Sequence, residues 1–171
     1  MNEKNIVECL YARSAANGQA PVYYFEGSTV TFSQLQQAAE QLAGALSRQG
    51  IKAGDRVAIL MNDSPAMAEA ILATMGIGAT PVLVSTMLGT VDLAHILNDA
   101  QPVSVIVSGS HVGQIETVKA QIGGNAALRI VDSSQPVDGY LQLDVLRKQG
   151  QPMRLNASAQ DALMLYTSGS T

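Results

Sequence analysis

The sequence predicts an α/β protein built on a parallel sheet with helices on both faces. Its strand-like segments are apolar throughout, as RVAILM at residues 56–61 illustrates, which is the pattern of strands buried on both sides. Segments with helical spacing of apolar residues separate these strands, and such alternation is typical of a parallel sheet. A chain of 171 residues with 47% hydrophobic residues is long enough for one domain with a sizeable core.

The first expected elements are a helix and a small hairpin. Apolar residues recur at helical spacing over residues 6–17, and Gly18 is a suitable stop. PVYYFEGSTVTF, residues 21–32, places β-forming residues around a Glu-Gly-Ser turn and predicts a hairpin. The single cysteine, Cys9, is interpreted as a small core residue of the helix. One cysteine allows no internal disulfide and suits a reducing compartment.

The next helix has the clearest signals in the sequence. Either Thr31 or Ser33 can cap it, with Gln34 or Gln36 three residues later as the capping-box partner. Gly50 is the expected end of this helix. Its predicted buried stripe consists of Leu35, Ala38, Ala39, Leu42, Ala43 and Leu46.

From residue 56 onward, strands and helices are expected to alternate. Ser64 and Pro65 predict a helix start, because serine caps well and proline suits the first helical position. That helix is expected to run to about Gly76, and Thr90 is the expected cap of the next one. The further predicted strands are residues 81–84, 103–107, 128–131 and 163–167. The further predicted helices are residues 91–100, 112–122 and 140–149.

Composition and charge exclude several classes of function. The net charge is −4 and the basic residues are scattered singly, so we expect no nucleic-acid partner. His95 and His111 are isolated and lack metal-ligand spacing, so no metal ligand is assigned. The N-terminus lacks the features of a signal peptide. The longest apolar stretch, residues 67–88, is interrupted by Glu69 and Pro81, so we expect no membrane span and a cytoplasmic location.

Two internal glycine patterns are weak candidates for a phosphate site. Residues 76–81 begin like a dinucleotide fingerprint, but they precede a strand and are interpreted as a helix stop. Residues 109–113 follow a strand and open a helix but lack a known fingerprint spacing. They are interpreted as a plain βα loop, and a binding domain that uses this loop stays an alternative. Asp63, Asp92 and Asp99 are interpreted as loop or helix-start carboxylates without an acid–base role.

The segment LMLYTSGST, residues 163–171, is the stronger candidate. An apolar strand runs here into small and hydroxylated residues, at the end of a strand where parallel sheets bind ligands. Hydroxyl groups and successive backbone N–H groups can form an anion site, and glycine allows close approach. On local grounds alone, a flexible polar tail is the simpler interpretation. The candidate binding residues are Thr167, Ser168, Gly169, Ser170 and Thr171.

Residues 161–171, DALMLYTSGST, resemble the first half of the phosphate-binding signature of the AMP-forming adenylating enzymes. This superfamily includes acyl- and aryl-CoA synthetases and the adenylation domains of peptide synthetases. The signature continues Gly-x-Pro-Lys-Gly, and the sequence stops before that half. Further resemblances occur in family order in TFSQL at residues 31–35, GIKAGDRVA at 50–58, NDSP at 62–65 and GATPV at 78–82.

The resemblance implies that residues 1–171 are the N-terminal part of a large AMP-binding domain, cut inside the phosphate-loop signature. It implies a reaction of a carboxylic acid with ATP to give an acyl-adenylate, which CoA then converts to a thioester with release of AMP. ATP, Mg²⁺ and CoA are thus the implied cofactors and co-substrates. The loop at residues 167–171 is implied to hold phosphates. No catalytic residue of the family falls in this sequence, so the isolated chain is predicted to be inactive.

Residues 78–109 are similar to the corresponding region of benzoate-CoA and related aryl-CoA ligases, which favours an aromatic or short acid. Two alternatives stay open: a non-catalytic module of the same fold that acts with a partner chain, and an adenylation domain of a peptide-synthetase-like enzyme. A partial domain exposes apolar faces, so we also expect self-association.

Overall fold

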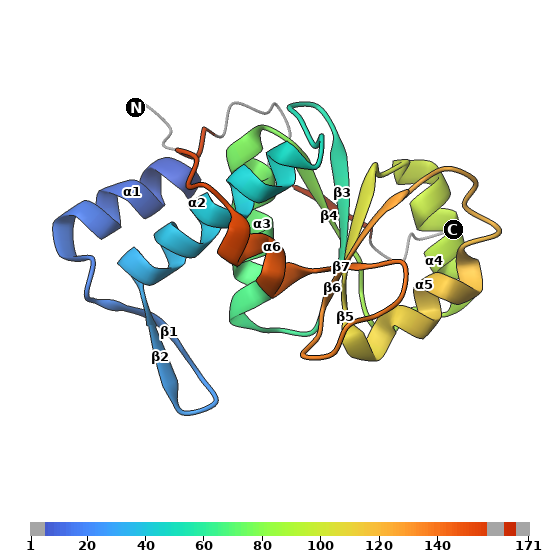
Figure 1. Ribbon diagram of the computed structural model, residues 1–171, viewed down its shortest axis with the longest axis horizontal. Helices are drawn as coiled ribbons and strands as arrows, with labels where there is room; N and C mark the ends of the chain where they lie inside the picture. The colour runs from blue at the N-terminus through green and yellow to red at the C-terminus, as the bar shows by residue number, and fades with distance from the viewer. Residues whose placement is uncertain (1–5, 157–162, 167–171) are drawn as a thin grey trace.

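A computed structural model describes residues 6–156 and 163–166. Its centre is a six-stranded sheet in the order β7-β6-β5-β3-β4-β8, in which each neighbouring pair is parallel (Figure 1). The predicted α/β class with a parallel sheet is therefore confirmed. The strands are β3 (Arg56–Leu60), β4 (Thr80–Leu83), β5 (Ser104–Ser108), β6 (Leu128–Asp132), β7 (Leu141–Gln142) and β8 (Met164–Leu165).

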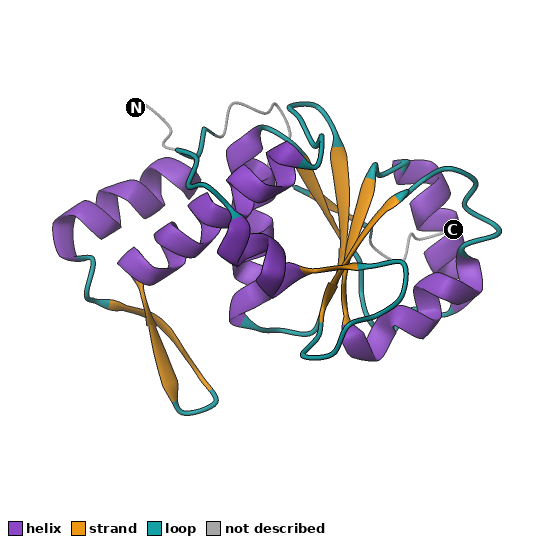
Figure 2. Ribbon diagram, viewed as in Figure 1, coloured by secondary structure: helices purple, strands orange, loops and turns teal. Residues whose placement is uncertain are grey.

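Helices cover both faces of the sheet (Figure 2). On one face α2 and α3 pack together, with α6 and α1 against α2; on the other face lie α4 and α5. The helices are α1 (Ile6–Asn17), α2 (Phe32–Arg48), α3 (Pro65–Ile77), α4 (Thr90–Ala100), α5 (Val112–Val118) and α6 (Leu143–Gln149). The predicted hairpin is also present, and it projects away from the sheet as β1 (Pro21–Phe25) and β2 (Ser28–Thr31).

The sheet separates two apolar cores because its strands send alternate side chains to opposite faces. In β3, Val57 and Ile59 belong to the core beneath α2 and α3. Ala58 and Leu60 belong to the core beneath α4 and α5. All four are essentially inaccessible to solvent, which explains why the segment after Arg56, residues 57–61, lacks polar side chains.

Helix α2 begins with one of the two predicted capping boxes. The Thr31 hydroxyl accepts a hydrogen bond from the N–H of Gln34 at 3.3 Å. The Gln34 side chain in turn accepts one from the N–H of Thr31 at 2.9 Å. Two otherwise unpaired donors of the first turn are thereby satisfied.

Thr31→Ala is expected to lower the free energy of unfolding by about 1 kcal/mol, the usual contribution of an N-cap side chain. Urea denaturation monitored by circular dichroism measures this change. Thr29→Ala is the matched control, because Thr29 is an exposed residue of the same strand. Equal stability of the two variants would show that the cap contributes nothing.

Helix α3 also starts as predicted. The Ser64 side chain accepts a hydrogen bond from the N–H of Met67 at 3.2 Å, and Pro65 occupies the first turn. Gly78 ends the helix in the left-handed conformation at φ 84°, which glycine adopts without steric cost. The interpretation of residues 76–81 as a helix stop is confirmed.

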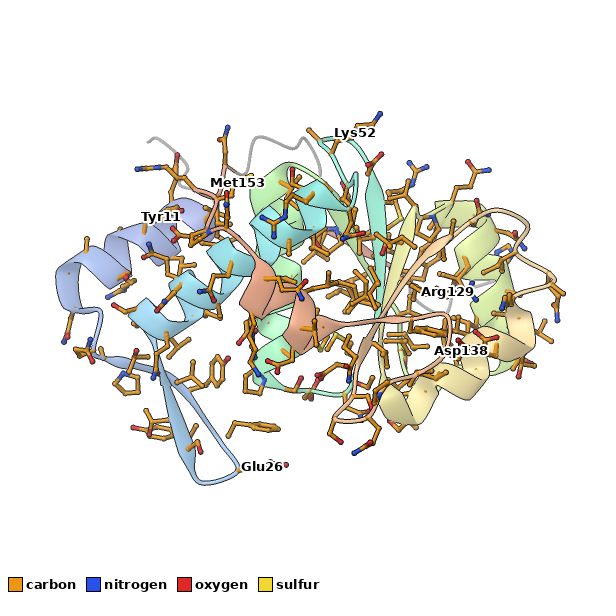
Figure 3. The ribbon with its side chains drawn as sticks, in the orientation of Figure 1. Tyr11, Glu26, Lys52, Arg129, Asp138 and Met153 are labelled. Atoms are coloured by element: carbon orange, nitrogen blue, oxygen red, sulfur yellow. The ribbon has the colours of Figure 1, made fainter. Side chains whose placement is uncertain are left out.

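Residues 150–156, here called the strap, run from the end of α6 across α2 and α3. The N–H of Met153 donates to the Glu40 carbonyl at 3.0 Å, and the N–H of Asn156 donates to the Gly76 carbonyl at 2.7 Å. The Tyr11 hydroxyl accepts a hydrogen bond from the N–H of Leu155 at 2.8 Å. Tyr11 and Met153 are labelled near one another, beside α1 and α2, in Figure 3. The strap therefore binds several helices through its backbone.

A buried ion pair joins α3 to α6. Glu69 is only 6% exposed, and its carboxylate lies 2.5 Å from the guanidinium of Arg147. The same guanidinium also contacts Asp144 at 2.6 Å. Burial raises the pKa of Glu69 above its ordinary value, although Arg147 opposes that shift. The pair is thus an electrostatic connection in a mainly apolar helix layer.

Several expectations from the sequence are wrong in detail. Cys9 is exposed rather than part of the core, because Val7 and Leu10 define the buried side of α1 and Cys9 lies about 100° from Leu10 around the helix. Thr90 is the first residue of α4, whose N-cap is Gly89, and no side chain caps this helix. The segment 140–149 begins with β7 before α6, because pairing with β6 extends its first residues.

Candidate functional site

The sheet has a topological switch point between β3 and β5. The chain passes from β3 through α3 to β4, then crosses through α4 to β5 on the opposite side of β3. The connections that leave β3 and β5 therefore diverge to opposite faces, which opens a crevice at the carboxyl ends of the strands. A cavity of about 490 Å³ lies there, beyond the ends of β3, β5 and β6.

Polar residues from three strand ends and the hairpin line this cavity. Serines follow or end β3, β5 and β6, and the hairpin contributes Phe25 and Glu26. Glu26 lies at the hairpin tip (Figure 3), where φ is 47° at Glu26 and 77° at Gly27. The turn thus brings a carboxylate from outside the sheet to the cavity wall.

Asn62 connects the ends of β3 and β5. Its N–H donates to the Ser108 hydroxyl at 3.0 Å, and its side-chain amide donates to the Ser110 hydroxyl at 3.2 Å. The amide oxygen of Asn62 lies 2.8 Å from Nε2 of His111, which donates this hydrogen bond. Sequence reasoning missed the cluster, because its members are far apart along the chain. Its hydrogen bonds connect the segments that follow β3 and β5.

The charges of the cavity disfavour an anionic ligand. Glu26, Asp63 and Asp132 are among its lining residues, and none of the lining residues is basic. Burial raises the pKa of Asp132, while the nearby Arg147 opposes that shift. A carboxylate that is already costly to ionise would be disfavoured further by a phosphate beside it. The cavity is therefore not a suitable triphosphate site.

The loop at residues 109–113 has the structure of a plain βα connection. Gly109–His111 forms a 3₁₀ turn that leads into the short helix α5 without a side-chain cap. A Cβ atom on Gly109 would lie 3.1 Å from the Cβ atom of Ser133. Close packing against the β6 loop thus accounts for this glycine, and the alternative phosphate site here loses its support.

The predicted phosphate loop, Thr167–Thr171, lies outside the described residues. The structure reaches Tyr166, the residue before it. Strand β8 runs parallel to β4, with Val82 opposite Met164 and Leu83 opposite Leu165. The chain therefore leaves β8 at the carboxyl edge of the sheet, where ligands of parallel sheets bind.

A side-chain hydrogen bond holds the residue at that exit. The Tyr166 hydroxyl donates to a carboxylate oxygen of Asp99 at 2.5 Å. Burial and this bond to Asp99 raise the pKa of Tyr166 to about 12. Asp99 lies in the last turn of α4, which corrects its interpretation as a loop or helix-start residue. Its partner could not be inferred from the sequence, because the two residues are remote along the chain.

Metal and membrane features are absent from the part of the chain that the structure describes. Residues 6–156 and 163–166 contain no group of three or more His, Cys, Asp or Glu side chains placed to hold a metal ion. Within the same ranges, no helix combines the length and the apolar character needed to cross a bilayer.

A parallel sheet with a switch point and helices on both faces is the architecture of many ligand-binding α/β domains. Comparison with known proteins gives the family. The model of the AMP-binding enzyme family matches residues 10–171. The chain belongs to this family, as its sequence motifs indicated.

Curated relatives and solved structures agree with this assignment. The chain is 27% identical to 3-oxocholest-4-en-26-oate–CoA ligase of Rhodococcus rhodochrous, over 85% of the chain and 27% of the relative. It is 32% identical to feruloyl-CoA synthase of an Amycolatopsis species over the same shares. The fold superposes with a TM-score of 0.89 on the crystal structure of an anthranilate CoA ligase in complex with anthranoyl-AMP. The two chains are 23% identical, and the superposition covers 98% of this chain and 33% of the other.

The chain therefore spans about a quarter of the length of these curated relatives, since 27% of each is covered.

Proposed function

We propose that residues 1–171 are the N-terminal part of an ATP-dependent, AMP-forming carboxylate:CoA ligase. The observation that carries this proposal is the family match across residues 10–171, and it is supported by strand β8, whose carboxyl end precedes the sequence TSGST by one residue. Several curated relatives are named CoA ligases or synthases. The reaction converts an acid, ATP and CoA to an acyl-CoA, AMP and pyrophosphate through an acyl-adenylate.

In this proposal, residues 167–171 bind the β- and γ-phosphates of ATP. The hydroxyl groups and backbone N–H groups of this loop are suited to stabilise the charge that develops as pyrophosphate leaves. Mg²⁺, when bound, neutralises phosphate charge. The described residues offer no cluster for it, so we assign its ligand to the remainder of the protein. No residue of this chain is proposed to be catalytic, and the isolated chain is proposed to be inactive.

We propose an aromatic or short acid as the substrate. The region at residues 78–109 supports this choice through its similarity to benzoate-CoA and other aryl-CoA ligases. Feruloyl-CoA synthase and the anthranilate CoA ligase are named for aromatic acids, whereas another relative is named for a steroid acid. The protein is further proposed to act in the cytoplasm.

Exposed apolar side chains bear on how the chain behaves by itself. Met87, Val91 and Leu165 are exposed apolar residues, at 93%, 79% and 62% of their maximum, and they support the proposal of self-association. A non-catalytic module that acts with a partner chain would use similar surfaces.

An adenylation domain of a peptide synthetase is the other alternative, and a relative that is a hybrid PKS–NRPS synthetase supports it.

The decisive experiment compares the chain of residues 1–171 with the protein extended by the coding sequence after Thr171. We expect ATP–pyrophosphate exchange with the extended protein and benzoate, and none above background with residues 1–171. Thioester formation from benzoate, a short-chain acid and a long-chain acid then ranks the substrates. Dependence on CoA separates the ligase from a peptide-synthetase domain.

In the extended protein, Ser170→Ala is expected to lower exchange about tenfold or more, since one lost donor to a developing phosphate charge commonly costs that much. Ser134→Ala is the matched control, because Ser134 lines the acidic cavity at β6 instead. Absence of exchange with every acid would contradict the proposed function. Equal exchange in both variants would contradict the role of the loop.

A further inference from the structure

The contact between Tyr166 and Asp99 joins the exit of β8 to the far end of α4. The ring of Tyr166 packs against the apolar core beneath α4 and α5. Its hydroxyl group donates to Asp99 at 2.5 Å. One side chain thus has both an apolar anchor and a charged hydrogen-bond partner, and bonds to a charged acceptor are stronger than neutral ones.

Asp99 occupies a position that local electrostatics disfavour. It lies in the last turn of α4, which contains no basic residue, and the carbonyl groups of a helix C-terminus carry partial negative charge. The guanidinium of Arg56 donates to the carbonyl of Ala100 in that turn, and the charge of Arg56 also acts on Tyr166. The Tyr166 hydroxyl is the donor that the Asp99 carboxylate has at this helix end, while Arg56 bonds to the neighbouring backbone carbonyl of Ala100.

Strand β8 is held by its pairing with β4 and by Met164, which packs with Tyr166 against the core beneath α4 and α5. It consists of Met164–Leu165 and pairs with β4 along one edge. Leu163 and Leu165 are exposed. Such a short edge strand is weakly held by its backbone alone. The bond from Tyr166 to Asp99 is the side-chain hydrogen bond found at its end.

We propose that Tyr166 and Asp99 are positioning residues that fix the direction in which the chain enters the phosphate loop at residues 167–171. This inference rests on the proposed function of that loop. Neither residue contacts the reacting atoms. Their bond fixes the position of Tyr166, the residue that directly precedes the candidate phosphate-binding residues in sequence, and a fixed starting point lowers the ordering cost of binding ATP.

The first test uses the extended protein with Tyr166→Phe, Asp99→Ala and Asp99→Asn. We expect Tyr166→Phe and Asp99→Ala each to raise the KM for ATP about tenfold, the lower end expected from loss of a bond to a charged group. The KM for the acid should change less than twofold. Asp99→Asn keeps an acceptor oxygen and should restore a near-normal KM for ATP. The double variant Tyr166→Phe/Asp99→Ala should be no worse than either single variant, because both remove one interaction.

Tyr140→Phe is the matched control. The Tyr140 hydroxyl donates to Glu116 at 2.8 Å, a tyrosine–carboxylate bond of the same kind that lies away from β8. It should leave the KM for ATP unchanged. An equal rise in Tyr140→Phe would show a general effect on stability and would overturn the proposal.

The second test is independent of catalysis. Hydrogen exchange on residues 1–171 should show faster exchange at residues 163–166 in Tyr166→Phe than in wild type, with no such change in Tyr140→Phe. If neither the wild-type extended protein nor any variant shows ATP-dependent activity, the proposed function fails. In that case, hydrogen exchange alone decides whether Tyr166 fixes the end of β8. Unchanged exchange at residues 163–166 overturns that anchoring. Faster exchange with an unchanged KM for ATP overturns the positioning role.

Discussion

Gly44→Ala is expected to lower the free energy of unfolding by about 3 kcal/mol, the upper range for overpacking a well-packed site. In a helix interior, alanine normally stabilises relative to glycine by roughly 0.5–1 kcal/mol. The sign reverses here because a Cβ atom on Gly44 would lie 1.9 Å from the carbonyl oxygen of Gln151. That oxygen belongs to the backbone of the strap, which hydrogen bonds on either side hold in place.

Gly113→Ala is the matched control for this prediction. Gly113 also lies in a helix, α5, and a Cβ atom there would meet nothing within 4 Å. We expect Gly113→Ala to be neutral or to stabilise by up to about 1 kcal/mol. Urea denaturation of both variants measures the two changes. If Gly44→Ala were as stable as Gly113→Ala, the strap would not pack against α2 at Gly44.

Arg147→Met is expected to destabilise the fold by about 3 kcal/mol at neutral pH, the lower end for breaking a buried ion pair. The lower end applies because Arg147 itself is 29% exposed, whereas Glu69 is only 8% exposed at its side chain. Methionine retains most of the apolar contact of the arginine stem, so the effect reports the unpaired carboxylate. Lys148→Met is the control, because Lys148 is 73% exposed and should matter by less than about 0.5 kcal/mol.

The effect of Arg147→Met should depend on pH. Burial already raises the pKa of Glu69 above 4.5, and loss of Arg147 removes the influence that opposes the shift. A carboxyl group with a raised folded pKa binds protons more readily in the folded state, so its contribution to stability is lost as pH rises through that pKa. The difference from wild type should therefore be largest near about pH 7 and shrink toward pH 4.5. Denaturation midpoints across this range measure it, and a pH-independent difference would contradict the explanation.

Local signals made several elements predictable from the sequence. Thr31 with Gln34, and Ser64 with Pro65, lie within a few residues of one another, so the start of each helix depends on its own segment. The uninterrupted apolar run at residues 56–61 likewise revealed a strand buried on both faces. The hairpin at residues 21–32 was predictable for the same reason, since its strands and turn are adjacent in sequence.

Contacts between remote residues were not predictable. The chain order gives no indication that β3 lies between β5 and β4, nor that Asn62 meets Ser108 and His111. The acidic cavity depends on this strand order, because it lies beyond the ends of β3, β5 and β6. The family resemblance indicated the phosphate loop, whose residues lie outside the described ranges. The structure adds the edge strand that precedes it and the Asp99 partner of Tyr166.

The position of β8 has a consequence for the kinetics of folding. Met164 pairs with Val82, so β8 can join the sheet only when the long segment between these two residues forms a closed loop. Closing such a loop loses chain entropy before any contact is gained, and pairings remote in sequence slow folding. Strands β3, β4 and β5, with their connecting helices, can assemble first from nearer segments. The strand that carries the candidate ATP-binding loop is thus added late, to a sheet whose central strands are already paired.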